Sequence, residues 1–500
     1  MRYAVAIVLI VVLSPFSGIV SGEYEQDRIE NSESSSIMES YSIPVQLAFD
    51  RAEDISRYSQ DEILSTKEWL VVTGIPLNEH TKSLSNPISS IETKVLPGSY
   101  IWEMEDGGKA VESLTKAMEI GEIESFSPVI KMEHTKKFYP NDPEFGSQWH
   151  LENSGQTGGL SGEDANLTGA WDSYNGSGVV ISIVDDGLDI SHPDIAPNYD
   201  QSASYDWCND DSDPTPLSFD GHGTAAAGVA GAAGNNSIYV SGAAFGASLA
   251  GSTLIACSIN DFDESQALSY ENDYIDIYSN SWGPSDTGRI LDGPGPLMTA
   301  AFENDVFQGR DGLGNIITWA AGNGLTNDDD SNYDGYANSR YTIAVTAITH
   351  LGEQSYYAEP GANILVAAHS NGDGEAITTT DIVGSGGYNS SGNVTDTFGG
   401  TSSATPLVSG VIALMLEANQ NLTWRDVQHI LVNTARVNDP TDSSWEINGA
   451  GHDVSHKYGF GAVDASAAVA MSSNWTTVED EVNVSIGPMN SNFDLGDGIS

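Results

Sequence analysis

Basic residues are scarce in this chain of 500 residues, which has 18 lysines and arginines against 71 aspartates and glutamates and a formal net charge of −53 at pH 7. So large a negative surplus excludes the electrostatic binding of nucleic acid or of an anionic membrane surface, and it favours a cationic partner. The basic residues are also unevenly placed. The first 137 residues hold 12 basic and 22 acidic side chains, which leaves 6 basic and 49 acidic ones beyond Lys137.

Cysteine and long apolar runs are also nearly absent. Cys208 and Cys257 are the only cysteines, so disulfides cannot be the main support of the fold, and the sequence leaves open whether these two pair. The one long apolar run, residues 4–13, follows Met1-Arg2 and leads into small residues up to position 22. This pattern predicts a secretory signal peptide over residues 1–22, because the run is too short to span a bilayer comfortably. We expect a secreted protein without a stable membrane span, an uncleaved signal anchor being the minority alternative.

Three short segments contain residues suited to nucleophilic catalysis. Asp185 ends a strand-like run, His222 stands at the start of an alanine-rich helix-like run, and Ser402 lies in Gly-Gly-Thr-Ser-Ser-Ala-Thr-Pro at 399–406. A serine nucleophile needs a base to take its proton and a carboxylate to orient that base. Each segment alone is more often a turn, a structural histidine or a helix cap. Their joint occurrence predicts a triad of Asp185, His222 and Ser402.

A fourth residue suited to catalysis is Asn323. It follows the apolar run 316–321, which would bring it to the carboxyl edge of a parallel sheet, where sites in open α/β folds form. A side-chain amide there would stabilise a developing oxyanion together with a backbone N–H. The alternative is that Asn323-Gly324 is merely a turn.

These segments resemble the subtilisin family of serine proteases, and more closely its kexin and furin branch, the proprotein convertases. The resemblance runs from about Asn141 to Thr477 and is carried by Asp185-Asp-Gly-Leu, Ser191-His-Pro-Asp, Ser281-Trp-Gly-Pro, Trp319-Ala-Ala-Gly-Asn-Gly, Asp334-Gly-Tyr and Asn421-Leu-Thr-Trp-Arg-Asp-Val-Gln-His. It implies an α/β fold with a subtilisin-like parallel sheet covered by helices on both faces, preceded by a small α+β prodomain. Two departures from the branch are the few cysteines and Ala226, where a cysteine is often found.

The same resemblance suggests how the chain is divided. We expect a propeptide over residues 23–137, flexible at 23–42 and with an inhibitory prodomain at about 65–137, then a peptidase domain over 138–475. Self-cleavage is predicted after Lys137, within the only adjacent basic pair of the chain. Residues 476–500 would be a short tail or the start of a truncated P domain. Strand-like runs are predicted at 69–73, 95–101, 179–184, 274–279, 316–321 and 342–348, and helix-like runs at 110–118 and 407–416.

A preference for basic substrates is implied by the acidic residues that fall at the family's substrate-binding positions. A protease that buries a cation must offset its desolvation with carboxylates. By resemblance, Asp286 and Asp334 would bind the residue before the cut bond, and Asp186 would bind the residue before that one. The fourth subsite would be formed by Glu264, Asp292 and Tyr336. Trp282 and Gly283 would lie beside these substrate-binding positions. Phe219 replaces the second carboxylate of subsite 2, with Asp220 displaced by one residue, so selectivity there should be looser. Taken singly, each acid is more often an ordinary surface charge.

Calcium is the cofactor that the resemblance implies, because Ca²⁺ takes six to eight oxygen ligands from carboxylates and carbonyls on loops. Three sets of ligands are expected: Asp142, Asp194 and Asn236 with backbone carbonyls of Ala233, Ile238 and Val240; Asp206, Asp211 and Asp213; and Asp329 and Glu359 sharing Asp286. The alternative for Asp328-Asp329-Asp330 is a solvated loop.

The sequence therefore predicts a secreted, calcium-dependent serine endopeptidase that cleaves after Arg or Lys and is inhibited by its own prodomain. Ser402 would attack the carbonyl, His222 would transfer the proton, Asp185 would orient His222, and Asn323 would stabilise the oxyanion. Two alternatives remain. One is an extracellular subtilase of broad specificity, and the other is a catalytically silent protein that binds calcium or a partner.

Overall fold

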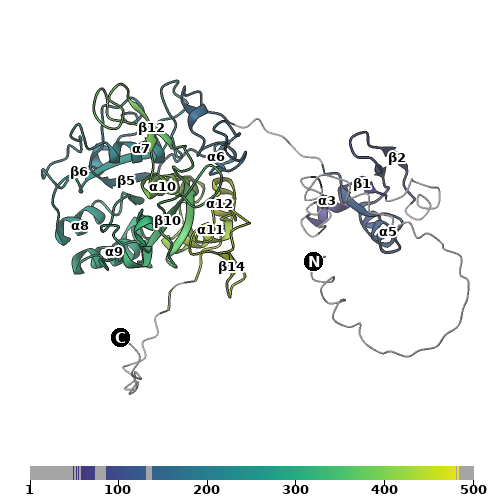
Figure 1. Cartoon of the computed structure of the whole chain (residues 1–500). Coiled ribbons are helices and arrows are strands. Elements are labelled where there is room, and N and C mark those ends of the chain that lie inside the picture. Colours follow the sequence, from purple (N-terminus) through teal and green to yellow (C-terminus); the bar gives the residue numbers. More distant parts are fainter. Residues whose placement is uncertain are drawn as a thin grey trace, which may run out of the picture. The chain divides into compact units, whose positions relative to one another are not determined.

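The computed structural model describes residues 58–73, 86–130, 138–479 and 481–482, and four single positions at 45, 49, 52 and 55. These residues belong to two compact units, one within Met1–Thr135 and one within Lys136–Ser500 (Figure 1). The predicted signal peptide, the segment 23–42, the Lys136-Lys137 pair and most of the predicted tail lie outside the described residues.

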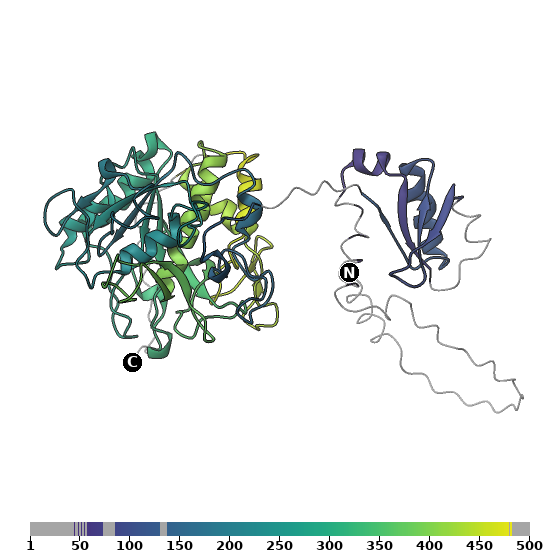
Figure 2. The same cartoon turned by 90° about the horizontal axis from the view of Figure 1, so that it is seen from above.

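The first unit is a four-stranded antiparallel sheet in the order β2-β3-β1-β4 with a helix packed against it (Figure 2). Its elements are α3 (Gln60–Ser65), β1 (Glu68–Val72), β2 (Ser89–Glu92), β3 (Ser99–Glu103), α5 (Gly107–Glu119) and β4 (Ser125–Pro128). Trp69 and Trp102 are register partners, and both pack fully buried in one core with Leu114 of α5. The predicted strand 95–101 begins only at Ser99, because Pro97-Gly98 forms a turn in which Gly98 adopts φ +75°.

The second unit contains a seven-stranded, all-parallel sheet in the order β11-β10-β9-β8-β5-β7-β6. Its strands are β5 (Val180–Asp185), β6 (Tyr205–Asp206), β7 (Ser248–Thr253), β8 (Ile277–Asn280), β9 (Ile316–Ala320), β10 (Thr342–Ile348) and β11 (Ile364–His369). Strand β5 pairs with β7 on one side and with β8 on the other, although both come later in the chain. The strand order thus reverses at β5, which is where ligand sites form in open α/β sheets.

Helices cover both faces of this sheet. Side chains alternate along β9: Thr318 bonds Ser409 of α10 (Oγ1···Oγ, 2.8 Å), whereas Trp319 meets Phe302 of α9 edge to face, with ring centroids 5.9 Å apart. Alternate residues of one strand therefore face α10 (Thr401–Ala418) and α9 (Pro296–Gln308). In Figure 1, α7 (His222–Gly231) lies with α10, and α8 (Asp261–Leu268) lies with α9. The remaining elements are α6 (Leu167–Ala170), α11 (Trp424–Thr434), α12 (Ala465–Ser472), the hairpin β12 (Ile377–Thr380) and β13 (Val394–Phe398), and the short pair β14 (Glu446–Ile447) and β15 (Asp453–Val454).

The expected fold class is confirmed by this covered parallel sheet. The predicted run 342–348 is β10 residue for residue, and 316–321 is β9 with one residue more. The run 274–279 is wrong at its start: Tyr274 and Ile275 donate their N–H groups to the Glu271 carbonyl in a turn, so β8 begins at Ile277.

Helix α10 is the central core helix, although its length and composition would also suit a membrane span. In its most apolar window 89% of the residues are buried inside the unit. Pro406 is the sixth residue of α10 and lies inside the helix; the Ser402 carbonyl, which its missing N–H leaves free, accepts the Ser281 hydroxyl at 3.2 Å instead. Cys208, two residues after the edge strand β6, forms a disulfide with Cys257. The sequence had left open whether these two cysteines pair.

Candidate active site

The predicted catalytic residues gather where the parallel strands end. Asp185 is the last residue of β5, Ser281 follows β8, and Asn323 comes three residues after β9. Helices α7 and α10 begin at the same edge, with His222 as the first residue of α7 and Ser402 as the second of α10. Five distant parts of the chain thus meet because the carboxyl ends of parallel strands share one edge.

Asp185 and His222 form a direct pair. The imidazole Nδ1 lies 2.8 and 3.0 Å from the two carboxylate oxygens of Asp185, which is itself only 1% exposed. This contact fixes the ring and directs Nε2 away from Asp185, as a general base requires. Burial lowers the pKa of His222, but the charge and hydrogen bond of Asp185 and the charge of Asp186 outweigh it and raise the pKa to about 9.

Asp186 lies at the amino end of α7 rather than free in a cleft. Its carboxylate accepts the backbone N–H groups of His222 (3.1 Å) and Gly223 (2.7 Å), two donors that an α-helix leaves unsatisfied at its start. Burial and the charge of Asp185 raise the pKa of Asp186 to about 7, against the lowering effect of these N–H donors. The structure thus gives Asp186 a role in positioning His222, besides the substrate role expected from sequence.

Ser402 is nearly buried, and its hydroxyl bonds the carbonyl of Ser281 (Oγ···O, 3.3 Å). No hydrogen bond joins it to His222 within the part of the chain that the structure describes. Catalytic hydrogen bonds are often long without substrate and tighten when it binds. Phe398, four residues before Ser402, packs edge to face on the His222 ring at 5.4 Å, so the base and the nucleophile-bearing turn lie side by side.

Asn323 is oriented by the turn that precedes Ser402. Its Oδ1 accepts the backbone N–H of Thr401 (2.8 Å) and the Thr401 hydroxyl (3.1 Å). Because the amide oxygen is held there, the Nδ2 donors are left for another acceptor. The backbone N–H of Ser402, in the first turn of α10, is likewise without an acceptor among the described residues. These two donors suit the oxyanion that develops on a carbonyl oxygen when the Ser402 hydroxyl attacks that carbonyl.

Sequence analysis missed a second amide that holds this turn. Asn371 Oδ1 accepts the Gly400 N–H at 2.7 Å, and Ser370 Oγ bonds the Gly400 carbonyl at 2.7 Å. A Cβ on Gly399 would lie 2.1 Å from Asn371 Oδ1, so the glycine is required by this contact. The clue was present, because Ser370 and Asn371 directly follow the strand-like run ending at His369, just as Asn323 follows its own.

Beside Asn323 lies a cavity of about 470 Å³ that carries the first two predicted acids of the substrate site. Asp334 Oδ1 accepts the N–H groups of Tyr336 and Ala337 at 2.7 and 3.3 Å, while Oδ2 points at Gly283, whose added Cβ would lie 2.9 Å from it. Burial raises the pKa of Asp334 to about 7, with a further rise from the charges of Asp286 and Asp292. Within the part of the chain that the structure describes, this carboxylate has no cationic partner, and it lines an open cavity.

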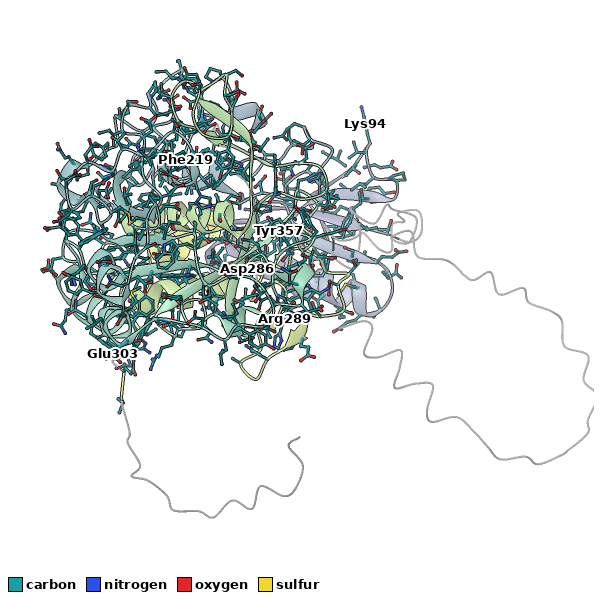
Figure 3. All side chains as sticks on the ribbon, turned by 60° about the vertical axis from the view of Figure 1, so that its left-hand side comes forward. Lys94, Phe219, Asp286, Arg289, Glu303 and Tyr357 are labelled. Atoms are coloured by element: carbon teal, nitrogen blue, oxygen red, sulfur yellow. A yellow bond between two sulfur atoms is a disulfide. The ribbon has the colours of Figure 1, made fainter. Side chains whose placement is uncertain are left out.

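Asp286, labelled in Figure 3, lines the same cavity and accepts the Asn323 N–H at 2.9 Å. It therefore ties the substrate cavity to the predicted oxyanion site. Burial first, and then the charge of Asp329, raises the pKa of Asp286.

The residues expected at the fourth subsite are also brought together. Glu264 accepts the Tyr336 hydroxyl at 2.9 Å, and burial first, then the charge of Asp292 among others, raises the pKa of Glu264. The Tyr336 ring stacks on Trp319 at 5.0 Å and meets Trp282 edge to face at 5.5 Å. An aromatic wall thus connects this subsite with the cavity lined by Asp334.

The region expected for subsite 2 carries an aromatic side chain in place of an acid. Phe219, labelled in Figure 3, is 76% exposed and lies three residues before His222. Asp220 Oδ2 is buried without a hydrogen-bond partner among the described residues, and burial raises the pKa of Asp220. Tyr388 packs on Phe398 at 5.8 Å, and Phe398 in turn packs on His222 of the Asp185–His222 pair.

One predicted calcium set lines a common cavity. Asp286, Asp329 and Glu359 surround a space of about 20 Å³, which suits a single small ion. Glu359 Oε1 accepts the Gly324 N–H and Asp329 Oδ2 the Gly288 N–H. Burial, with the charges of Asp286 and Asp329, raises the pKa of Glu359 to about 8. These carboxylates are crowded and have no cationic side chain at ion-pair distance within the described ranges.

The other two predicted sets are less convergent. Asn236 bridges the first: its Nδ2 donates to Asp194 (2.9 Å) and its N–H to Asp142 (3.0 Å). In the second set the carboxylates of Asp206, Asp211 and Asp213 accept N–H groups of their own turns. Across residues 58–73, 86–130, 138–479 and 481–482, no group of three or more histidine, cysteine or acidic side chains is arranged to hold a metal ion, so the side chains of all three predicted sets, Asp286, Asp329 and Glu359 included, would have to move closer together to bind one.

Comparison with known proteins agrees with this geometry. The model of the subtilase family matches residues 176–461. The chain is 44% identical to human proprotein convertase subtilisin/kexin type 6 over 351 residues, which is 69% of this chain and 35% of that protein. It is 40% identical to human furin over 364 residues, or 71% of this chain and 44% of furin. The chain thus spans about a third to a half of the length of these relatives.

Solved structures show the same fold. A serine protease of Aeromonas sobria superposes with a TM-score of 0.64 at 28% identity, covering 70% of each chain. A protease of Pseudoalteromonas arctica gives a TM-score of 0.54 at 26% identity, covering 67% of this chain and 99% of that one. On the family match, the fold and the identity to proprotein convertases, this chain belongs to the subtilase family of serine proteases, in its kexin and furin branch.

Proposed function

We propose that this protein is a secreted, calcium-dependent serine endopeptidase that cleaves after Arg or Lys and processes itself after Lys137. The observation that carries the proposal is the Asp334 carboxylate, which has no cationic partner among the described residues and lines a cavity together with Asn323 and Thr401. Membership of the family supports the hydrolytic chemistry, and this cavity supports the basic specificity.

Catalysis would follow from the contacts at the sheet edge. His222, oriented by Asp185, takes the Ser402 proton as the hydroxyl attacks the substrate carbonyl, and then gives it to the leaving amine. Asn323 Nδ2 and the Ser402 N–H stabilise the oxyanion, and their fixed positions avoid reorganisation during the step. Asp186 holds the start of α7, and Asn371 the Gly400 turn, so both are positioning residues.

Specificity would follow from charge. The side chain of Arg or Lys entering the cavity meets Asp334 Oδ2, with Asp286 beside it. A cation there replaces mutual repulsion between buried carboxylates by attraction, which offsets its own desolvation. Glu264 and Asp292 would favour a second basic side chain further from the cut bond. Phe219 at subsite 2 supports looser selection there, which is the one observation that favours the alternative of a broad-specificity subtilase.

Calcium would be held first by Asp286, Asp329 and Glu359, where uncompensated carboxylates already share a small cavity. A bound Ca²⁺ supplies charge compensation next to the substrate cavity and no step of the hydrolysis. The side chains must still converge on the ion, so its binding would stabilise the folded state. We therefore expect chelation by EGTA to lower the melting temperature and added Ca²⁺, but not Mg²⁺, to restore it. No change on chelation would contradict this site.

The domain assignment and the location are part of the proposal. Residues 1–22 would be a signal peptide, the first unit the inhibitory prodomain, and the second unit the peptidase. The Cys208–Cys257 disulfide supports an oxidising compartment, and so does the secretory pattern at the amino end.

A fluorophosphonate probe and a peptide library test the proposal together. We expect the probe to label Ser402 in the secreted protein and the library to show cleavage after Arg and Lys. Labelling without a basic preference would leave the broad-specificity alternative. Absence of labelling, with Ser402→Ala as the matched blank, would instead indicate a catalytically silent protein.

A further inference from the structure

Phe138, the first described residue after the predicted cleavage point, is held in an aromatic cluster. Its ring stacks on Phe245 with centroids 5.5 Å apart and meets Trp171 edge to face at 6.4 Å. Trp171 and Phe245 also contact each other at 5.5 Å, and the Trp171 indole donates to the Ala243 carbonyl at 2.8 Å. Such ring pairs add to the energy of burial, so the position of Phe138 is well defined.

The backbone nitrogen of Phe138 faces a carboxylate. Its N–H donates to Asp172 Oδ1 at 3.0 Å, and Asp172 is exposed in the turn that follows α6. An N–H to carboxylate bond of this kind becomes stronger when the donor is itself charged. The one way in which this nitrogen gains a charge is by becoming the amino terminus of the chain.

This place is far from the nucleophile. Residues next to Phe245 pack on Gly410, and Asn175, just after Asp172, donates its N–H to Glu417 at 2.7 Å. Gly410 and Glu417 lie 8 and 15 residues beyond Ser402 in α10, so the helix rise puts them about 12 and 22 Å from it. A bond that Ser402 attacks must lie about 3 Å from its hydroxyl. Phe138 therefore cannot occupy this place while the Lys137–Phe138 bond is being cut.

We propose that Asp172, Trp171 and Phe245 form a receptor for the amino terminus that self-cleavage after Lys137 creates. The proposal rests on the self-processing put forward above. Hydrolysis adds one water across the Lys137–Phe138 bond and leaves a carboxylate on Lys137 and an amine on Phe138, which takes up a proton near neutral pH. The new ammonium group pairs with Asp172 and the ring is held between Phe245 and Trp171. Docking removes the product end from the active site and so opposes religation and inhibition by that end.

The test uses the full chain, secreted and self-processed. Mass spectrometry should give Phe138 as the mature amino terminus. The pH dependence of acylation of its α-amine should then give a pKa above the usual range of ~7.7–8.0, and Asp172→Asn should return it by about 0.2 to 0.7 pH units. Asp453→Asn is the matched control, since Asp453 is an exposed carboxylate without a side-chain hydrogen bond among the described residues. Turnover of a small peptide should not change in either variant.

A second variant tests the aromatic part. Phe245→Ala should speed removal of Phe138 by an aminopeptidase about 2- to 10-fold. The variant keeps only the ring contact with Trp171, so Phe138 should be docked for a smaller fraction of the time. An amine pKa that is the same with and without Asp172, or a mature terminus at another residue, would overturn the proposal. To keep this separate from a failure of the enzyme, the Ser402→Ala chain can be cut in trans by the wild-type protein. A protein that cuts neither itself nor this variant would contradict the proposed function instead.

Discussion

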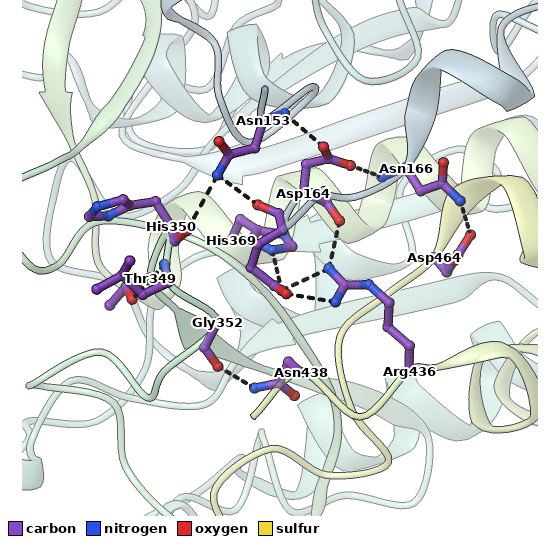
Figure 4. Close-up of polar contacts among 12 residues, drawn as sticks. Asn153, Asp164, Asn166, Thr349, His350, Gly352, His369, Arg436, Asn438 and Asp464 are labelled. Carbon is purple, nitrogen blue, oxygen red and sulfur yellow. Dashed lines mark hydrogen bonds and ion pairs between the residues drawn. The ribbon is translucent and has the colours of Figure 1, made fainter. Parts of the chain in front are cut away.

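Two groups of buried or half-buried acids in the second unit differ in what compensates their charge. At the catalytic edge Asp334 and Glu359 have no basic partner among the described residues, and burial raises their pKa values to about 7 and about 8. Elsewhere in the unit, Glu163 is buried against Arg436, whose Nη1 and Nη2 lie 2.8 and 2.7 Å from its oxygens, and against His369 Nε2 at 3.0 Å (Figure 4). There burial is outweighed by these partners, and the pKa of Glu163 falls to about 2.

The difference separates structure from function. The Glu163 group continues to Asp164, whose carboxylate accepts the N–H groups of Asn153 and Asn166 and whose carbonyl accepts Arg436 Nη2 at 2.9 Å, so Arg436 joins distant segments of the chain (Figure 4). A protein that buried acids only for stability would pair them in this way. Under the proposed function, Asp334 and Glu359 would instead be compensated by partners from outside the chain, a basic side chain and a metal ion.

Ser402→Ala should produce the largest effect at the catalytic edge. Removal of the nucleophile should lower kcat by about 10⁶-fold and block self-processing, because the remaining groups supply only oxyanion stabilisation and binding. Burst titration with an activated ester, alongside Ser403→Ala as the neighbouring control, measures the loss. Retained turnover would contradict the role of Ser402.

Asn323→Ala should follow, with a fall of about 10²–10³ in kcat and little change in KM, since the amide acts on the transition state alone. Steady-state kinetics on one peptide separates the two constants. Asn323→Asp keeps the acceptor for Thr401 but loses the donor, so it should not rescue activity. A rescue would show that Asn323 only supports the turn.

Glu163→Gln should affect stability rather than chemistry. The variant leaves Arg436 without its charge partner, and a buried pair broken on one side costs about 3–5 kcal/mol, less here because Arg436 is 27% exposed. Since the pKa of Glu163 is lowered in the fold, this stabilisation is present above its ordinary value and is lost as pH falls toward 2. Urea unfolding should show a smaller difference in stability between variant and wild type at pH 3 than at pH 7. An equal loss at both would rule out the ion pair.

The smallest expected effect is a shift of the pH profile of kcat/KM. His222 must be neutral to accept a proton, and its pKa is raised, so activity should increase as pH rises through that value. Asp186→Asn removes one of the charges that raise it and should move the rise to lower pH. Asp292→Asn removes a charge of the expected fourth subsite that is not among those raising the pKa of His222, so it should leave the profile in place.

The fold, and most of the polar residues at the carboxyl edge of the parallel sheet, could be predicted from the sequence because both depend on local patterns. Apolar runs such as 316–321 and 342–348 predict strands, and the polar residues that end them fall at the sheet edge. Asn371 was missed because its partner Gly400 is 29 residues away, and Glu163 because Arg436 is 273 residues away. Such pairings depend on tertiary packing, as does the disulfide. The roles of the triad and of the subsites stay predictions.

The role of Asp334 in selecting a basic substrate is tested most directly by Asp334→Asn, which replaces the carboxylate with an amide of the same shape. We would compare kcat/KM for a peptide with Arg before the cut bond and for one with norleucine, in wild type and in Asp334→Asn. Wild type should prefer Arg, and the variant should lose about 2 kcal/mol or more of that preference, since an unpaired cation is then buried, while norleucine is cut as before. An equal preference for Arg in both proteins would contradict the claim that Asp334 selects the substrate.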